Sequence, residues 1–260
     1  MDPLIITLDG PAGSGKSTVA RQLARRLGLE FLDTGAMYRG ITAQILDDGI
    51  DPKVNPQAVA DFARDCTIRF DWKSDPPRLY INNRDVTMRL RDSDVTGNVS
   101  DVAAMPDVRR VLVMEQRHIG HEHPRLVTEG RDQGSVVFPN AHAKFYLDAK
   151  AEVRAQRRAA QLRAEGRDAD ERVILQQIIA RDHKDSHRAS DPLIKPADAE
   201  TIDTSNLTLE QVIDLLEKKG RQRMKAGGQA DSQVVVADGV KPQSKPGPVP
   251  GGAPRAGARR

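Results

Sequence analysis

Residues 4–18, LIITLDGPAGSGKST, decide the fold class of this chain. The segment GPAGSGKS matches the phosphate-binding pattern G-x-x-x-x-G-K-[ST], with Gly10, Gly15, Lys16 and Ser17 in register. An apolar run before it predicts a strand. The residues after it, STVARQLARRLG, have apolar side chains at helical spacing and end on Gly28, a typical helix stop. This strand–loop–helix context predicts a site for a nucleoside triphosphate.

The glycines of the loop allow backbone N–H groups to turn toward phosphate oxygens, and the helix N-terminus adds a favourable dipole. Lys16 is placed to reach the β- and γ-phosphates, and the Ser17 hydroxyl to bind Mg²⁺. The predicted ATP-binding loop consists of Gly10, Pro11, Ala12, Gly13, Ser14, Gly15, Lys16, Ser17 and Thr18. GTPases, helicases and many kinases share such a loop, so the chemistry depends on the other residues.

Composition limits the remaining possibilities. The chain has 260 residues, of which 38% are hydrophobic, enough for one large domain or two small ones. No apolar run reaches the eighteen residues that predict a membrane span, so no membrane partner is expected. The single cysteine, Cys66, forms no intrachain disulfide and suits a reducing cytoplasm.

Positive charge is concentrated at the C-terminus. Residues 221–260 contain eight Lys or Arg and two Asp, a net charge of +6, so residues 1–220 carry −3 of the chain's total of +3. This tail is rich in Gly and Pro and has no apolar periodicity, so we predict that it is disordered and dispensable. Binding to nucleic acid is expected at most as weak contacts of the tail. The folded domain should comprise residues 1–220, and its last helix should end at Gly220.

Strand and helix patterns alternate over residues 1–220. Strands are predicted at 4–9, 29–32, 125–129, 143–148 and 199–203, which indicates an α/β fold with a five-stranded parallel sheet flanked by helices. Residues 66–90 differ, because two short β patterns flank Asp75-Pro76-Pro77 and predict an antiparallel excursion. We therefore expect a small β-containing insert at about 62–95.

Polar clusters follow three of the predicted parallel strands. They are the phosphate loop, DTGAMYR at 33–39 and GRDQG at 130–134. Ligands gather beyond the carboxyl ends of such strands, so the three clusters together predict a second, anionic substrate. Taken singly, DTGAMYR is equally well a helix cap, and GRDQG a turn with a local Arg–Asp pair.

Two predicted helices carry arginines toward this edge. On the helix at 173–188, the stripe formed by Ile174 and Ile178 continues as Arg181, Asp185 and Arg188. On the preceding helix, Arg154, Arg157 and Arg158 share one face beside the loop RAEGRDAD. Such a cluster can neutralise phosphate charge when a lid closes, and we place the Arg-rich lid at about 154–172.

Six motifs together resemble those of the bacterial cytidylate kinases. They are DGPAGSGKST, LDTGAMYR, NVSDVAAMPDVR, EGRDQGSVVFP, RAQRRAAQL and ARDHKDSHRASDPL, in collinear order over about residues 3–218. The resemblance implies a P-loop nucleoside-monophosphate kinase fold. It also implies transfer of the ATP γ-phosphoryl group to CMP or dCMP with Mg²⁺, by a monomer. The family often has Ser where Thr34 stands, which preserves the hydroxyl, and its pattern does not include the tail.

The resemblance also implies roles for individual residues. Cytosine is read by Thr34, Arg109 and Asp132, and the sugar is contacted by Ser100, Arg181 and Asp185. The CMP phosphate is held by Tyr38, Arg39, Arg131 and Arg188, and Arg154, Arg157 and Arg158 belong to the lid, Arg157 on the ATP side. The residues expected to act in catalysis are Lys16, Arg131, Arg154, Arg158 and Arg188.

The chemistry of a phosphate acceptor agrees with this residue set. A monophosphate has its second pKa at about 6, so its oxygen attacks without a general base. The site must instead hold two polyanions in line, which requires arginines, Lys16 and Mg²⁺. Three alternatives stay open: a kinase for another acceptor, such as an adenylate or shikimate kinase; a P-loop switch protein, although no N-K-x-D motif occurs; and a nucleic-acid-binding protein.

Overall fold

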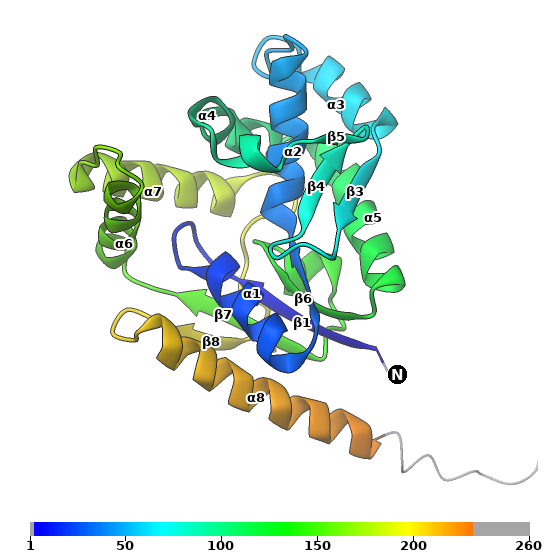
Figure 1. Ribbon diagram of the computed structural model, residues 1–260, viewed down its shortest axis with the longest axis vertical. Coiled ribbons are helices and arrows are strands. Elements are labelled where there is room, and N and C mark those ends of the chain that lie inside the picture. Colours follow the sequence, from blue (N-terminus) through cyan, green and yellow to red (C-terminus); the bar gives the residue numbers. More distant parts are fainter. Residues whose placement is uncertain (1–2, 231–260) are drawn as a thin grey trace, which may run out of the picture.

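A computed structural model describes residues 3–230 of the chain (Figure 1). The central sheet has five strands, all parallel, in the order β2-β6-β1-β7-β8. The strands are β1 (Leu4–Asp9), β2 (Glu30–Asp33), β6 (Arg125–Glu129), β7 (Ala143–Asp148) and β8 (Glu200–Asp203). The five predicted strands are confirmed within one residue at each end.

Helices cover both faces of this sheet because successive side chains of a strand point to opposite sides. Leu4, Ile6 and Leu8 of β1 pack with α1 (Lys16–Leu27) and α8 (Leu209–Ala230). Ile5 points the other way, toward Val113 of α5 (Pro106–Glu122) and the π-helical turn η2 (Gln133–Val137). The apolar strand run LIITL therefore serves two separate cores.

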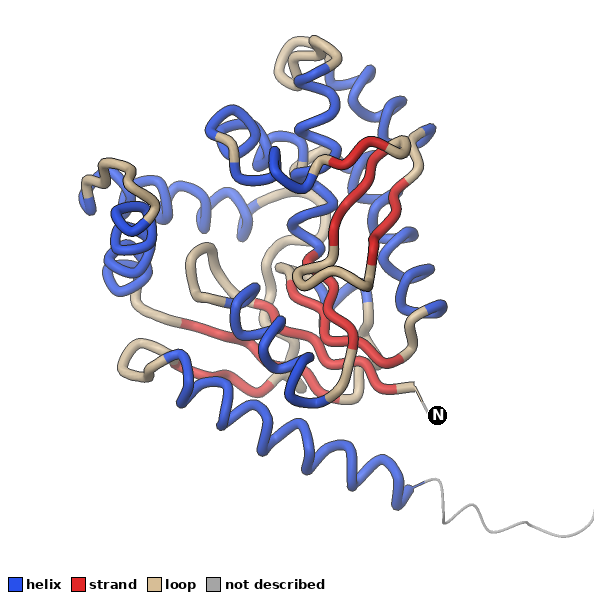
Figure 2. Tube along the Cα trace, viewed as in Figure 1, coloured by secondary structure: helices blue, strands red, loops and turns tan. Residues whose placement is uncertain are grey.

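The predicted insert is a three-stranded antiparallel sheet, drawn apart from the main sheet in Figure 2. It contains β3 (Ile68–Asp71), β4 (Arg78–Ile81) and β5 (Arg84–Asp85), followed by the 3-10 helix η1 (Thr87–Arg91) and α4 (Ser93–Val102). It packs on α2 (Thr34–Asp47) and lies beside α3 (Pro56–Asp65). Gly40 makes this contact possible, since a Cβ there would lie 2.6 Å from Leu79 Cδ2.

Two helices joined by a short loop stand where the lid was predicted. These are α6 (Ala151–Ala164) and α7 (Glu171–His187), joined by residues 165–170. Ala155 and Ala159 of α6 pack against Ile174 and Ile178 of α7, so the predicted apolar stripe is confirmed. Helix α7 ends one residue earlier than predicted, and Arg188 is its C-cap with an extended backbone.

The predicted end of the last helix was wrong. Helix α8 continues through Gly220 to Ala230, so residues 221–230 are helical rather than part of a disordered tail. Gly220 is a packing glycine: a Cβ there would lie 3.2 Å from Leu27 Cδ1. Arg221 donates to the Arg26 carbonyl at 3.0 Å, and Met224 packs against the core. Residues 231–260, the rest of the predicted disordered segment, lie outside the described part. No helix within residues 3–230 has the length and apolarity needed to cross a bilayer.

Candidate functional site

The three predicted polar clusters meet at the carboxyl edge of the parallel sheet. Asp9, at the end of β1, accepts hydrogen bonds from the backbone N–H groups of Gln133 (2.9 Å) and Gly134 (2.7 Å). Thr34 Oγ1, at the start of α2, donates to the Glu129 carbonyl at 2.8 Å. These bonds tie the ends of three adjacent strands together. Burial raises the pKa of Asp9 to about 6.

The glycine-rich loop has the backbone that phosphate binding requires. Gly13 and Gly15 have φ values of 76° and 87°, in the left-handed region that favours glycine, and α1 begins directly after them. Lys16 is only 5% exposed, and its ammonium donates to the Pro11 carbonyl at 2.8 Å and to Ser14 Oγ at 3.3 Å. Burial, reinforced by the charge of Arg131, lowers the pKa of Lys16 to about 7. A bound polyanion is the partner that this ammonium lacks.

Two carboxylates that the sequence analysis left without a role stand beside the loop. Ser17 Oγ donates to Glu129 Oε1 at 2.6 Å. Burial and the neighbouring Glu129 raise the pKa of Asp33 to about 7. Asp33 and Glu129 are the last residues of strands β2 and β6 of the central sheet. This position could have identified them as candidate site residues from the sequence. Hydroxyl and carboxylate oxygens are suitable for a hard divalent cation, although no group of three or more His, Cys, Asp or Glu within the described residues is arranged to hold a metal.

Four arginines gather near Lys16 and Asp185, namely Arg39, Arg131, Arg181 and Arg188. Arg131 Nε donates to Asp185 Oδ2 at 2.9 Å, and Arg39 Nη1 donates to the Leu90 carbonyl at 3.1 Å. Burial, with the charge of Arg131 close by, lowers the pKa of Arg181 to about 10. Burial alone would raise the pKa of Asp185, but Arg131 and Arg181 outweigh it and lower the pKa. The cluster thus carries more positive charge than Asp185 can offset.

Three buried donors of this cluster have no hydrogen-bond partner among the described residues. They are Arg181 Nε, Arg188 Nη2 and the Tyr38 hydroxyl. Buried polar groups are nearly always paired, because an unpaired donor keeps the full desolvation cost. Donors left open together at the edge of a parallel sheet point to an anionic ligand that completes them. Tyr38, Arg181 and Arg188 belong to the predicted CMP-binding set.

Three further polar residues predicted to bind the second substrate, Thr34, Arg109 and Asp132, are buried at this end of the sheet. Arg109 is 1% exposed and donates to Asp132 Oδ2 through Nη2, and its guanidinium lies 5.6 Å from the Tyr38 ring centroid. Since the Thr34 hydroxyl proton is directed to the Glu129 carbonyl, the Thr34 oxygen faces other partners as an acceptor. These buried side chains therefore comprise two acceptors, Thr34 Oγ1 and the Asp132 carboxylate, and one donor, the Arg109 guanidinium.

The remaining predicted residues are placed less uniformly. Ser100 lies half-buried on α4, and Thr18 is exposed on the first turn of α1. The three arginines of α6, expected to form one cluster, bind three different places. Arg154 Nη1 donates to the Ala12 carbonyl at 2.7 Å, Arg157 Nη2 to the Thr204 carbonyl at 2.6 Å, and Arg158 Nη1 to Gln161 at 2.9 Å. Of these three arginines, Arg154 is the one that donates to the phosphate loop within the described part of the chain.

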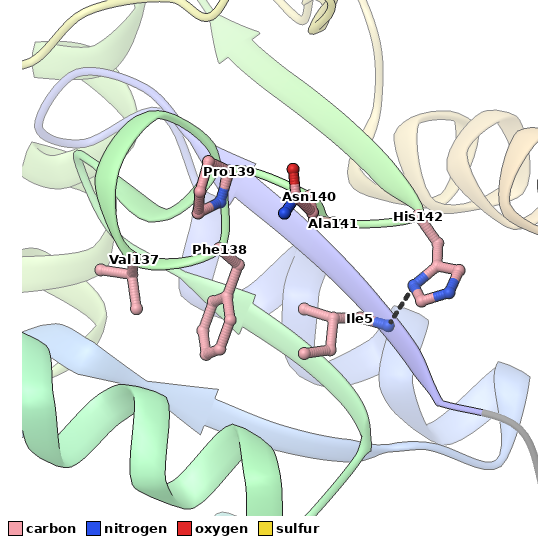
Figure 3. A pocket seen from close by; sticks show the side chains of 7 residues that line it. All are labelled: Ile5, Val137, Phe138, Pro139, Asn140, Ala141 and His142. Carbon is pink, nitrogen blue, oxygen red and sulfur yellow. Dashed lines mark hydrogen bonds between the residues drawn. The ribbon is translucent and has the colours of Figure 1, made fainter. Parts of the chain in front are cut away.

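A cavity of about 220 Å³ lies at the opposite, amino end of β1 (Figure 3). It is lined by Ile5, Val137, Phe138, Pro139, Asn140, Ala141 and His142. His142 Nδ1 accepts a hydrogen bond from the Ile5 N–H at 3.1 Å, drawn as a dashed line in Figure 3. This lining has no arginine or lysine, so it does not suit a polyphosphate.

Comparisons with known proteins agree with the geometry. A family model described as Cytidylate kinase matches residues 6–222. The cytidylate kinase of Nocardia farcinica (strain IFM 10152) is 44% identical over 227 residues, 86% of this chain and 97% of that protein. The cytidylate kinase of Rhodococcus opacus (strain B4) is 46% identical over 217 residues, 82% of this chain and 93% of that one. A solved gluconokinase from Sinorhizobium meliloti 1021 covers 89% of this chain and 98% of its own with 14% identity and a TM-score of 0.48, too low a likeness to support an activity.

Proposed function

The chain belongs to the cytidylate kinase family, and we propose that it transfers the γ-phosphoryl group of ATP to CMP or dCMP, giving CDP or dCDP and ADP. The fold is that of a P-loop kinase. The observation that carries the choice of substrate is the set of buried polar side chains in which Asp132 pairs with Arg109 and the Thr34 hydroxyl donates to the Glu129 carbonyl, which leaves the Thr34 oxygen as an acceptor.

These side chains distinguish cytosine from uracil by the polarity of their groups. Cytosine presents an amino donor at position 4 and acceptors at N3 and O2, whereas uracil presents a carbonyl at position 4 and an N–H at N3. The acceptors Thr34 and Asp132 suit the amino group, and the guanidinium of Arg109 suits the acceptor atoms. The position-4 carbonyl of uracil brings no donor and would face the Thr34 and Asp132 oxygens, acceptor against acceptor, which is the proposed source of discrimination.

The arginine cluster is the proposed site of the CMP phosphate. Tyr38, Arg39, Arg131 and Arg188 bind it, and Arg181, Ser100 and Asp185 contact the sugar. The unpaired donors of Tyr38 and Arg188 support this placement. The acceptor phosphate oxygen is anionic at neutral pH, since its second pKa is about 6, so no general base is needed. The contribution of these residues is alignment and charge neutralisation.

The ATP phosphates are proposed to lie in the loop of residues 10–18, with Lys16 as the cation nearest the transferred group. Arg154 holds this loop through the Ala12 carbonyl. Arg158 is hydrogen-bonded to Gln161 alone among residues 3–230, and we propose that it turns toward the phosphates. Arg157 acts on the ATP side by fixing residues 204–207, through the carbonyls of Thr204 and Leu207. The lid is proposed to exclude water as it closes, which suppresses ATP hydrolysis.

The residues beside Ser17 fit a magnesium ion. Asp33 has a raised pKa because it is buried next to Glu129, and a divalent cation would relieve that repulsion. Ser17 would bind the ion directly, with Glu129 and Asp33 orienting its remaining oxygen ligands. The chemistry that a bound Mg²⁺ would supply here is neutralisation of part of the phosphate charge. We further propose that the enzyme works as a monomer in the cytoplasm.

A coupled ADP-release assay over CMP, dCMP, UMP, AMP and GMP tests the proposal. CMP and dCMP should be turned over at least about a hundredfold more efficiently than UMP, because the position-4 carbonyl of uracil would face acceptor oxygens. AMP as the preferred acceptor would favour the adenylate kinase alternative. Equal use of CMP and UMP would show that Thr34 and Asp132 do not read the base.

A further inference from the structure

Asp191 joins the two arginines on which CMP recognition depends. It lies three residues beyond Arg188, in the segment that follows α7. Its Oδ2 atom accepts from Arg109 Nε at 2.9 Å, and its backbone carbonyl accepts from Arg188 Nε at 2.7 Å. One residue thus binds the Nε atom of both the base-reading arginine and the phosphate-site arginine.

The contact with Asp191 occupies one of the hydrogen-bond donors of Arg109. A guanidinium has five N–H donors. In Arg109, Nε binds Asp191, Nη2 binds Asp132 and Nη1 binds the Ala103 carbonyl at 3.4 Å. The two N–H groups that remain are both on the Nη atoms. Asp191 therefore fixes the plane of the guanidinium and leaves its outer edge for the base.

Arg188 is held in the same way. Its Nε binds the Asp191 carbonyl, while its Nη2 has no hydrogen-bond partner among the described residues and lies 3.9 Å from Asp132 Oδ2. The outer edge of this second guanidinium is likewise left for a ligand. Both arginines are consequently oriented from behind by the same residue.

The backbone of Asp191 is unusual. Its φ is +47°, in the left-handed region, and Pro192 follows it, a neighbour that normally favours an extended conformation. Asp and Asn are among the few residues other than glycine that adopt the left-handed conformation. A strained residue that persists at a binding site is a candidate for a functional role. Here the strained backbone directs the carbonyl to Arg188 while the side chain reaches Arg109.

We infer that Asp191 is a positioning residue for substrate specificity, which sets Arg109 and Arg188 in a fixed relative orientation and so couples reading of the cytosine to binding of its phosphate. The inference rests on the proposed function. Asp191 does not itself touch CMP; it acts through the two guanidiniums.

Three substitutions separate the side chain from the backbone. Asp191→Gly keeps the left-handed backbone and the carbonyl but removes the carboxylate. It should raise KM for CMP about tenfold and lower the preference for CMP over UMP by a similar factor, with KM for ATP unchanged. Asp191→Asn keeps an acceptor and tolerates the backbone, so it should stay within about threefold of the wild type. Asp191→Ala also disfavours the left-handed backbone, so it should bind CMP more weakly than Asp191→Gly.

Asp198→Gly is the matched control. Asp198 is a carboxylate paired with Lys144 at 2.7 Å, outside the candidate site. Its loss should leave unchanged the ratio of kcat/KM for CMP to kcat/KM for UMP, here called the CMP-to-UMP ratio. A double-substitution cycle adds a readout that general destabilisation would not move. In an Arg109→Lys background the Nε donor is absent, so Asp191→Gly should change the ratio less than about twofold.

An Asp191→Gly enzyme with the wild-type CMP-to-UMP ratio would overturn the inference, as would equal losses for CMP, UMP and ATP. If the glycine variant does not fold, Asp191→Asn and Asp191→Ala carry the test: an alanine variant as selective as the asparagine variant rejects it. The wild-type substrate panel keeps the two proposals apart. No preference for CMP in the wild type rejects the proposed function, whereas a preference that Asp191→Gly leaves intact rejects only the role of Asp191.

Discussion

Replacing Lys16 by methionine should stabilise the ligand-free protein while removing its activity. Lys16 is buried, and its pKa is lowered from 10.5 to about 7 by burial and by Arg131. This difference corresponds to a cost of about 4 kcal/mol in folding free energy at pH 7. Methionine has a similar length and no charge, but it loses the bonds to Pro11 and Ser14, worth about 2 kcal/mol together. The net gain is about 2 kcal/mol, or roughly 5 °C in Tm for a domain of this size.

The stabilisation by Lys16→Met should depend on pH. Because the folded-state pKa lies below the unfolded value, the unfolded chain binds more protons between pH 7 and 10.5, and wild-type stability rises with pH across this window. The free-energy cost of burying the Lys16 ammonium is fully present below about pH 7 and is lost as the pH approaches 10.5. The advantage of Lys16→Met should therefore shrink as the pH is raised, and near pH 10.5 the variant should be the less stable protein.

Thermal unfolding of the ligand-free protein from pH 6.5 to 10 measures the change in stability. The coupled assay at pH 7 measures the loss of activity, and kcat should fall at least about a hundredfold. Lys144→Met is the matched control. Lys144 is also buried, but it has a carboxylate partner, Asp198, and binds the Pro139 carbonyl. Its replacement should lower Tm by a few degrees and leave the kinetics unchanged. The prediction is contradicted if Lys16→Met melts below the wild type at pH 7, or if the difference in Tm between the two proteins does not change with pH.

Three further predictions concern the base-reading residues and the last helix. Asp132→Ala removes the carboxylate bound by Arg109, so KM for CMP should rise at least about tenfold with KM for ATP within about twofold; a selective loss of ATP affinity would place Asp132 at the ATP site instead. Thr34→Val keeps the side-chain shape but removes the acceptor oxygen, so kcat/KM for CMP relative to UMP should fall about tenfold, and an unchanged ratio contradicts this assignment. Truncation after Gly220 removes the contacts of Arg221 and Met224 and should lower Tm by several degrees, whereas truncation after Ala230 should change neither Tm nor kinetics; equal melting points for the two would show that residues 221–230 do not contribute to stability.

Local sequence patterns were sufficient to predict the central sheet and the phosphate loop. The five strands have apolar runs bounded by turn residues, and the phosphate loop has its glycines where positive φ is needed, so both could be predicted. The same holds for the stripe that leads from Ile174 to Asp185, since helical periodicity alone puts those residues on one face. The end of α8 could not be predicted, because a glycine that stops a helix and one that packs against Leu27 look alike in sequence.

The elements that form and the chemical groups they carry can be read from the sequence: a phosphate loop, an excess of arginines and an acceptor-rich motif near the end of β6. Which of these groups have partners depends on how the elements pack. Arg154, Arg157 and Arg158 share a helix yet bind three different places, whereas Asp191 holds two arginines that are far apart along the chain. The physical reason is that periodicity fixes the direction of a side chain on its own element. Its partner, its burial and its pKa depend on what other elements bring to the same place.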